Sequence, residues 1–225
     1  MKIQDILLFD EQLTDEELII QKSARDYCQN ELLPRITNAN RNEIFDKGIY
    51  KEMGELGFLG APIDGYGCAG TNYVSYGLIA REIERVDSSY RSAFSVQTSL
   101  AMHAIYHFGS DEQKDFYLPQ MAKGELIGCF GLTESDAGSD PASMKTNAVE
   151  KDDGYILNGS KTWITNSPIA DVLVIWAKDE QGVLRGFIVD RDCEGLTTPV
   201  IDGKFALRAS VTGQIFLEDV FVSKD

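Results

Sequence analysis

The hydrophobic pattern of this chain changes its period close to residue 127, and this change limits the possible folds more than any other feature. Before it, apolar residues recur at intervals of three and four, as in Tyr76, Ile79 and Ile83, which is the period of an amphipathic helix. After it, short runs of β-branched and aromatic residues alternate with turn residues, which is typical of strands. The sequence therefore predicts an α+β chain, with an all-α helical domain over residues 1–127 and an antiparallel, barrel-like β domain over residues 128–225.

Five helices are expected in the first half. Two of them begin with a capping box, in which a Ser or Thr side chain and a Glu or Gln side chain three residues later bond to each other's backbone amides. These pairs are Thr14 with Glu17, and Ser110 with Gln113. The other three helices are expected over about residues 43–56, from near Asn72 to Val86, and from Ser88 or Ser89 to Phe108.

Proline and glycine set the expected ends of these helices. A proline inside a helix removes a backbone donor and clashes with the preceding turn. The first helix is therefore expected to stop before Pro34, and the fifth to end or kink at Pro119. Gly57 and Gly109 are expected to end two of the others, because glycine is common just after a helix.

The second half contains turn dipeptides and short strand-like runs. Asp153-Gly154 and Asn158-Gly159 are of the type found in hairpin turns. The sequence has neither internal repeats nor long flexible linkers, so the two halves are expected to pack against each other. Strands are expected over residues 171–178, 184–190 and 213–222.

The formal net charge of the chain is −15. This charge argues against nonspecific binding to nucleic acid or to anionic membranes, because both are polyanionic. The N-terminus has one lysine and early acidic residues, which is typical of neither a signal peptide nor a transit peptide. No apolar run of about 18 residues is present. A cytoplasmic protein that acts on small molecules is therefore expected.

Two short motifs suggest binding sites, but their context favours structural roles. Residues 65–70 match G-x-G-x-x-G, yet no clear parallel strand precedes them; a tight connecting loop is expected. His103 and His107 have a spacing that suits zinc, but no third ligand accompanies them, so no metal site is expected. Reduced thiols are expected at the four widely separated cysteines, which are Cys28, Cys68, Cys129 and Cys193.

Two longer motifs point to a known family. CFGLTESDAGSDP, residues 129–141, is followed by NGSKTWITNSPIADVLVIWA, residues 158–177. In this order they resemble the acyl-CoA dehydrogenase family. Further motifs, among them REIERVDSSYRSAFSVQTSL at residues 81–100, resemble its glutaryl-CoA dehydrogenase branch, and the likeness covers nearly the whole chain. It implies a helical domain, a middle β domain and a C-terminal four-helix domain, of which we expect the last to be absent from this chain.

The resemblance also implies FAD as the cofactor. By matching position, it assigns flavin contacts to Phe130, Leu132, Thr133, Gly138, Ser139, Trp163, Ile164 and Thr165. The residue types suit this role, since Thr133 and Ser139 can donate hydrogen bonds to the flavin edge and Trp163 can form an apolar wall. Taken alone, Trp163 fits equally well as a strand residue that fills a barrel, and Thr133 as an ordinary turn former.

For the substrate, the resemblance implies a pocket that holds the distal carboxylate of glutaryl-CoA. It assigns this pocket to Arg91 and Ser95, with Glu84 nearby and Ser92 assisting, and it brings Ser139 close to the acyl-CoA. Arg91 lies near the start of an expected helix and Glu84 near the end of the one before, and each position is unfavourable to the helix dipole. A carboxylate bound by Arg91 would offset this cost, and so would an ion pair between Glu84 and Arg91.

The reaction implied is the oxidation of the α,β-bond of glutaryl-CoA. A carboxylate base removes an α-proton while the β-hydrogen leaves as hydride to the flavin, and loss of the γ-carboxylate as carbon dioxide then gives crotonyl-CoA. A glutamate at position 84 is typical of the decarboxylating type. The base is a glutamate of the C-terminal domain, so no catalytic residue is expected within these residues. Electron-transfer flavoprotein is the expected electron acceptor, and the complete enzyme is expected to be a homotetramer.

Two other interpretations stay open. Within the family, the chain could come from another short-chain acyl-CoA dehydrogenase or from an acyl-CoA oxidase. In a different functional class, it could be a non-catalytic flavin- or acyl-CoA-binding fragment, or an interaction subunit. Whether the natural reading frame continues beyond Asp225 is the observation that would best separate a fragment from a remnant.

Overall fold

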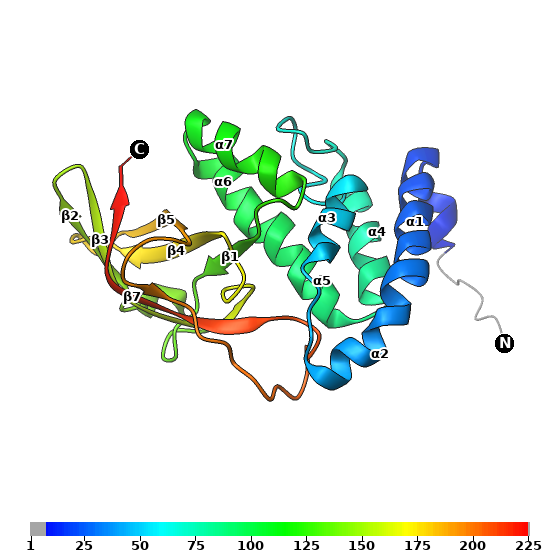
Figure 1. The fold of residues 1–225 in the computed structure, drawn as a ribbon. Helices are drawn as coiled ribbons and strands as arrows, with labels where there is room; N and C mark the ends of the chain where they lie inside the picture. Colours follow the sequence, from blue (N-terminus) through cyan, green and yellow to red (C-terminus); the bar gives the residue numbers. More distant parts are fainter. Residues whose placement is uncertain (1–7, 225) are drawn as a thin grey trace.

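The computed structural model describes residues 8–224, so the features expected at the extreme N-terminus lie in part outside the described residues. Helices come first along the chain and strands follow, with the helices packed together beside the sheet (Figure 1). The last helix, α7 (Asp111–Ala122), is followed by the first strand, β1 (Gly128–Gly131). The expected fold class, a helical domain followed by a curled β domain, is confirmed.

Both expected capping boxes are present. At the start of α1 (Asp15–Tyr27), the Glu17 amide donates to Thr14 Oγ1 (3.3 Å) and the Thr14 amide donates to Glu17 Oε2 (2.8 Å). At the start of α7, Ser110 and Gln113 make the same two bonds, at 3.2 and 3.0 Å. These contacts satisfy backbone donors that a helix N-terminus otherwise leaves unpaired.

The stop expected before Pro34 is wrong. After α1 the chain passes through a π-helical turn, Cys28–Leu32, and continues as α2 (Leu33–Asn42). The wider turn changes the hydrogen-bond register, so Pro34 falls in the first turn of α2, where its missing N–H is not needed. Pro119 likewise does not end α7, which runs for one further turn beyond it.

The helices between α2 and α7 match the expected segments, with two differences. The α3 helix begins five residues later than expected, because Asp46 Oδ1 accepts the Gly48 amide (2.9 Å) just before it. The long helix that follows α4 contains a π-helical segment that the sequence did not indicate. The bounds are Gly48–Glu55 for α3, Tyr73–Glu84 for α4, Ser88–Ser95 for α5, Val96–Met102 for the π segment and His103–Phe108 for α6.

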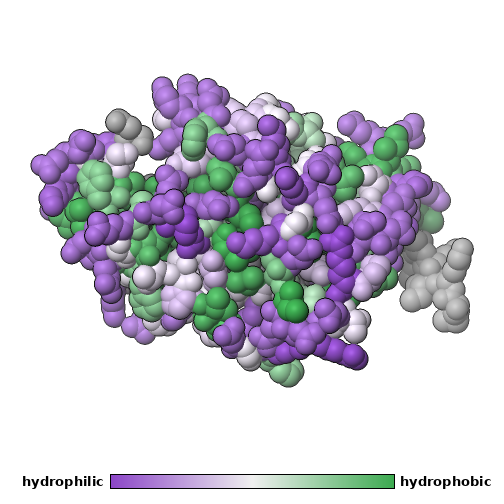
Figure 2. Space-filling model, viewed as in Figure 1, coloured by the Kyte–Doolittle hydropathy of each residue, from purple (hydrophilic) through white to green (hydrophobic). Residues whose placement is uncertain are grey.

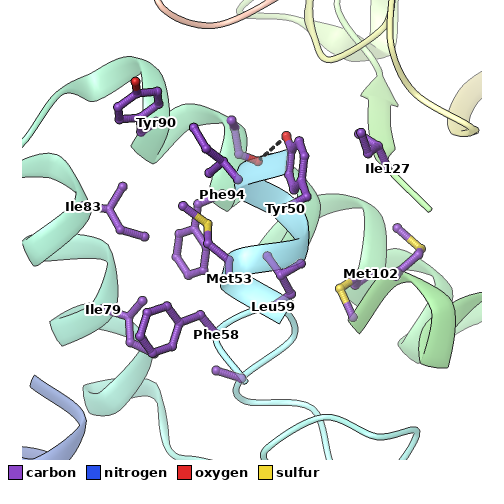
Figure 3. Close-up of a cluster of buried hydrophobic side chains, with 14 of the residues drawn as sticks. Tyr50, Met53, Phe58, Leu59, Ile79, Ile83, Tyr90, Phe94, Met102 and Ile127 are labelled. Carbon is purple, nitrogen blue, oxygen red and sulfur yellow. Dashed lines mark hydrogen bonds between the residues drawn. The ribbon is translucent and has the colours of Figure 1, made fainter. Parts of the chain in front are cut away.

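Aliphatic, aromatic and sulfur-containing side chains fill the centre of the helical domain (Figure 3). Tyr50 of α3 lies among them and donates a hydrogen bond to the Ala93 carbonyl of α5 (3.3 Å). The same buried cluster includes Val172 and Val174 of the β domain. The two halves therefore pack against each other, as the sequence predicts.

The sheet curls around a second buried cluster. Its strand order is β1-β4-β2-β3-β7-β6, with β5 paired to the other side of β4. Most pairings are antiparallel as expected, but β1 and β2 each pair with β4 in parallel. After β1, the strands are β2 (Asn147–Lys151), β3 (Gly154–Thr165), β4 (Val172–Lys178), β5 (Leu184–Asp190), β6 (Leu196–Thr197) and β7 (Thr212–Ser223).

The two expected hairpin dipeptides have different outcomes. A hairpin joins β2 to β3 at Asp153-Gly154 as predicted, with Asp152 and Asp153 in the turn and Gly154 as the first residue of β3. The turn expected at Asn158-Gly159 is wrong, because both residues lie inside β3 at a shift in its register with β7. Asn158 and Asp219 of β7 exchange two hydrogen bonds there (3.0 and 2.9 Å), which stabilise the irregular pairing without a turn.

The two short motifs take the positions that the sequence predicts for structural segments. Residues 65–70 form a connecting loop, in which Gly65, Gly67 and Gly70 all have positive φ. His103 Nδ1 lies 2.8 Å from the Thr98 carbonyl oxygen. Within residues 8–224, no group of three or more potential ligands could hold a metal ion.

Hydrophilic side chains cover most of the face seen in Figure 2, with apolar residues reaching the surface in patches between them. Among the described helices, none is both long and apolar enough to cross a membrane. The cysteines in the described part of the chain are free, and Cys28 and Cys129 are buried.

Candidate functional site

The residues expected to contact the flavin lie on two neighbouring segments. The first runs from Phe130 at the end of β1 into the loop that ends near Ser139, and the second is the end of β3, from Trp163 to Thr165. The Thr162 amide donates to the Thr133 carbonyl (2.9 Å). The fold therefore places the two groups side by side, although 23 residues separate Ser139 from Trp163 in sequence.

Trp163 is the most exposed large side chain of the second segment, with 62% of its surface accessible. Its φ of 59° is in the left-handed region, which a bulky residue rarely adopts and which costs about 1–3 kcal/mol. The strain coincides with the shift in register between Lys161 and Ile164. Trp163 is thus held outward at a strand irregularity, whereas Ile164 is buried in the β core.

The loop that is bonded to this part of β3 through Thr133 has open space and free donors. A Cβ atom added to Gly138 would meet nothing within 4 Å. Within residues 8–224, the hydroxyl groups of Thr133 and Ser139 make no hydrogen bond. An exposed aromatic ring beside unpaired donors fits a flat, polar-edged cofactor such as a flavin. Phe130 differs, since its ring packs on Trp176 (centroids 5.9 Å apart) on the side of the helical domain.

A buried ion pair lies beneath these segments, and the sequence did not indicate it. Lys161 Nζ donates to Glu134 Oε1 (2.8 Å) and to the Leu132 carbonyl (3.2 Å). Lys161 is 1% exposed and Glu134 9%. Lys161 lies between Ser160 and Thr162 on β3, and all three residues are polar. No apolar/polar alternation therefore indicates that Lys161 faces the core, and its burial could not be predicted.

The Glu134 carboxylate has several donors besides Lys161. It accepts the backbone amides of Lys145 (2.7 Å) and Thr146 (3.0 Å) and the hydroxyl of Thr146. Burial acts to raise the pKa of Glu134, but these hydrogen bonds outweigh it and bring the pKa down to about 2. Burial lowers the pKa of Lys161, and the nearby carboxylate acts in the opposite direction. Glu134 is therefore a structural anion, not an acid poised for catalysis.

The residues expected to hold the substrate carboxylate also lie together. Arg91 Nη1 donates to Ser95 Oγ (2.8 Å) one turn later on α5, and Arg91 Nε donates to Glu84 Oε2 (3.2 Å) at the end of α4. The Ser88 hydroxyl also bonds to Glu84. The Glu84–Arg91 pair, which the sequence left as an alternative to carboxylate binding, is thus present. Both side chains are nearly half exposed, so this contact contributes only about 0–1 kcal/mol.

Tyr76 extends this cluster, and the sequence did not single it out as a site residue. Its hydroxyl lies 3.1 Å from Ser95 Oγ, and its ring stacks on Phe94 with centroids 5.5 Å apart. The helical period of α4 predicts that Tyr76 faces the core. The contact of its hydroxyl with α5 depends on how the two helices pack, which the sequence alone does not specify.

One contact connects the two groups of expected residues. Ser92 Oγ of α5 lies 3.3 Å from Thr165 Oγ1 of β3. The helix that carries Arg91 and Ser95 is therefore joined to the strand that carries Trp163. A molecule that bound along α5 would end beside the face that fits a flavin.

Comparison with known families identifies this arrangement. A model of the acyl-CoA dehydrogenase N-terminal domain matches residues 14–125, and a model of the middle domain matches residues 129–220. The chain belongs to the acyl-CoA dehydrogenase family. This is a family of FAD-dependent oxidoreductases, and the match covers both the helical and the β part of the chain.

Individual relatives from the acyl-CoA dehydrogenase family act on different substrates. The structure of a Mycobacterium smegmatis glutaryl-CoA dehydrogenase in complex with FADH2 is 45% identical, with a TM-score of 0.93, over 95% of this chain and 55% of that one. The short-chain-specific acyl-CoA dehydrogenase of Clostridium acetobutylicum is 36% identical, over 93% of this chain and 57% of its own length. The mitochondrial isovaleryl-CoA dehydrogenase of Pongo abelii is 34% identical, over 92% and 51%.

The chain therefore spans only a little more than half the length of these acyl-CoA dehydrogenases. Their overall fold and their dependence on FAD are common to the family, whereas their acyl groups differ.

Proposed function

We propose that this chain is the N-terminal and middle portion of an FAD-dependent glutaryl-CoA dehydrogenase. In this proposal it provides one wall of the flavin site and the end of the substrate pocket that receives the distal carboxylate. The observation that carries the proposal is the cluster of Arg91, Ser95 and Glu84, which the Ser92–Thr165 contact connects to the flavin face.

FAD, when bound, would accept the hydride that leaves the β-carbon of the acyl group. In this chain, Thr133 and Ser139 would donate hydrogen bonds to it, Gly138 would allow close approach, and the ring of Trp163 would exclude water from one side. The exposure of Trp163 and the free hydroxyls of Thr133 and Ser139 support these assignments. Leu132 and Thr165 would contribute to the same wall, and Phe130 and Ile164 would support it from the core side.

Arg91 would bind the distal carboxylate. Its Nη2 makes no hydrogen bond within residues 8–224, so the guanidinium keeps a donor for a ligand. The weak, half-exposed pair with Glu84 can be exchanged for a substrate carboxylate at little cost. Ser95 would hold the guanidinium in position, and Ser92 would keep α5 against β3. An acyl group without a charge gains nothing from Arg91, which favours a dicarboxylic acyl-CoA.

The remaining parts of the activity rest on the sequence alone. Glu84 supports the decarboxylating type, which forms crotonyl-CoA. A base supplied from outside these residues, electron-transfer flavoprotein as the electron acceptor, a cytoplasmic location and a homotetrameric complete enzyme all belong to the proposal. Carbon dioxide release from glutaryl-CoA by the complete enzyme would separate the two reaction types.

Binding calorimetry with two matched ligands tests the substrate assignment. Glutaryl-CoA and valeryl-CoA have five-carbon acyl groups, and only the first has a distal carboxylate. With FAD present, Arg91→Met should weaken the binding of glutaryl-CoA about tenfold or more, the loss expected for one charged hydrogen bond. Valeryl-CoA binding should not change, and Arg41→Met, on the surface of α2, should affect neither. Equal losses for both ligands, or a wild-type preference for valeryl-CoA, would refute the assignment to glutaryl-CoA.

A further inference from the structure

We infer that the buried Lys161–Glu134 pair is a positioning element for the flavin wall. It fixes the loop that carries Leu132, Thr133 and Ser139 against the strand that carries Trp163. This inference rests on the proposed function, because it takes those residues to be the flavin contacts.

The contacts show how the pair connects the two segments. From β3, Lys161 Nζ reaches the Leu132 carbonyl (3.2 Å) and Glu134 Oε1 (2.8 Å), and the Thr162 amide reaches the Thr133 carbonyl (2.9 Å). Three successive residues of the loop are thus bonded to two successive residues of the strand. The position of the Thr133 hydroxyl relative to β3 is set by these bonds.

Glu134 fixes the other end of the loop. It accepts the amides of Lys145 and Thr146 (2.7 and 3.0 Å), and its backbone exchanges two hydrogen bonds with Ala137 (both 3.2 Å). The loop between residues 134 and 146 is therefore closed on one carboxylate. Ser139, at the exposed part of this loop, has no hydrogen bond of its own within residues 8–224, so its location depends on that closure.

A requirement for stability alone does not explain this pair well. A buried ion pair has a large desolvation cost, and well-packed apolar residues in its place are often as stable. A single carboxylate that pairs with one cation and two distant amides defines a specific loop geometry that apolar side chains would not. The same pair lies directly beneath the residues expected to donate to the flavin. These facts favour a role in positioning.

The test compares Lys161→Met with Arg185→Met. Arg185 Nε donates to Asp179 (2.6 Å), whose carboxylate also closes a turn of the β domain by accepting the amides of Gln181 and Val183. This turn joins β4 to β5, and its residues are not among the expected flavin contacts. Both variants remove a cation from a carboxylate that organises a loop, but Lys161 is buried whereas the Arg185 side chain is half exposed. Thr146→Val, which removes one hydroxyl donor to Glu134 and keeps the ion pair, is a milder variant if Lys161→Met folds poorly.

Three quantities are measured for each variant: the dissociation constant of FAD, the free energy of unfolding in urea, and the amide exchange rates of Lys145, Thr146 and Thr162. Lys161→Met should weaken FAD binding about tenfold or more, or about 1.4 kcal/mol, and should speed exchange at those three amides. Thr146→Val should cause a smaller change in the same direction. Arg185→Met should leave FAD binding and the amides of Lys145 and Thr162 unchanged, whatever it does to stability; Thr146 is not compared here, because its carbonyl accepts the Lys178 amide beside that turn.

Unchanged FAD binding and exchange in Lys161→Met would overturn the inference. So would a uniform rise in exchange over the whole β domain, because the pair would then act only on global stability. A failure of the wild-type chain to bind FAD would instead count against the proposed function. The exchange rates need no FAD, so they still show whether the pair orders the loop.

Discussion

The hydroxyl oxygens of Ser92 and Thr165 lie 3.3 Å apart, at the junction between the helical domain and the β domain. Ser92 lies one residue after Arg91, and Thr165 lies two residues after Trp163. The contact therefore sets the distance between the carboxylate end of the proposed substrate pocket and the proposed flavin wall.

Removing either hydroxyl should weaken this junction slightly. Ser92→Ala, which removes the hydroxyl, and Thr165→Val, which replaces it with a methyl group, should show a coupling free energy of about 0.5–1 kcal/mol, because a neutral hydrogen bond contributes this much. Urea unfolding of the two single variants and the double variant measures it. Strictly additive effects would mean that the two hydroxyls do not interact in solution.

Glu82 should be the most sensitive charged residue of the helical domain. It is fully buried, with Arg25, Arg81 and Arg85 within 3.3 Å of its carboxylate. Burial acts to raise its pKa, yet hydrogen bonds from Arg25 and Arg85 hold the pKa below its usual value. Glu82→Ala leaves these arginines without their shared anion and should cost about 3–5 kcal/mol in urea unfolding.

The exposed Lys22–Asp26 pair of α1 is the control for Glu82. Asp26→Asn should change the free energy of unfolding by less than about 0.5 kcal/mol, because exposed ion pairs contribute little. Similar losses for Glu82→Ala and Asp26→Asn would show that burial does not determine the effect.

Glu134 should make the free energy of unfolding depend on pH in the acidic range. Its pKa is about 2 in the folded chain, against a reference value of 4.5, so the folded state favours the ionised form. This contribution is complete above pH 4.5 and is lost as the pH falls towards 2. The difference in unfolding free energy between wild type and Glu134→Gln should therefore shrink over that range. A difference that does not vary with pH would contradict the assigned hydrogen bonds.

Two glycines should respond to substitution in opposite directions. A Cβ on Gly159 would lie 2.5 Å from Thr146 Oγ1 and 2.7 Å from its Cα, so Gly159→Ala should destabilise the chain by about 1–3 kcal/mol. A Cβ on Gly77, inside α4, would meet nothing within 4 Å. Gly77→Ala should therefore stabilise the chain by about 0.5–1 kcal/mol, through helix propensity. Thermal or urea unfolding of both variants measures the difference in sign.

Local sequence patterns predicted the elements whose causes are local. The capping boxes at Thr14 and Ser110 and the turn at Asp153-Gly154 each depend on residues within a few positions of one another. The helix end predicted at Pro34 and the turn predicted at Asn158-Gly159 were wrong, because the effects of these residues depend on other segments of the chain. A π-helical turn accommodates Pro34, and the pairing of Asn158 with Asp219 on β7 keeps that dipeptide inside a strand.

The candidate site likewise combines residues that the sequence indicated with residues that it did not. The motif resemblance indicated Trp163, Thr133 and Arg91, and the fold brings their segments together. Lys161 and Glu134 were not indicated, because their pairing joins positions 27 residues apart and nothing in the local pattern marks a buried lysine. Tyr76 was missed for a related reason, since its contact with Ser95 lies between two helices.

The most direct test of the central claim, that this chain forms a flavin wall around Trp163, is a fluorescence titration with FAD. The chain has two tryptophans; Trp163 is 62% exposed, whereas Trp176 is only partly exposed and has a buried indole nitrogen. FAD should quench the wild-type emission in a saturable way, and this quenching should be clearly weaker in Trp163→Phe, which retains only Trp176, near Phe130. Saturable quenching of the same amplitude and affinity in Trp163→Phe, or no saturable quenching in the wild type, would contradict the claim.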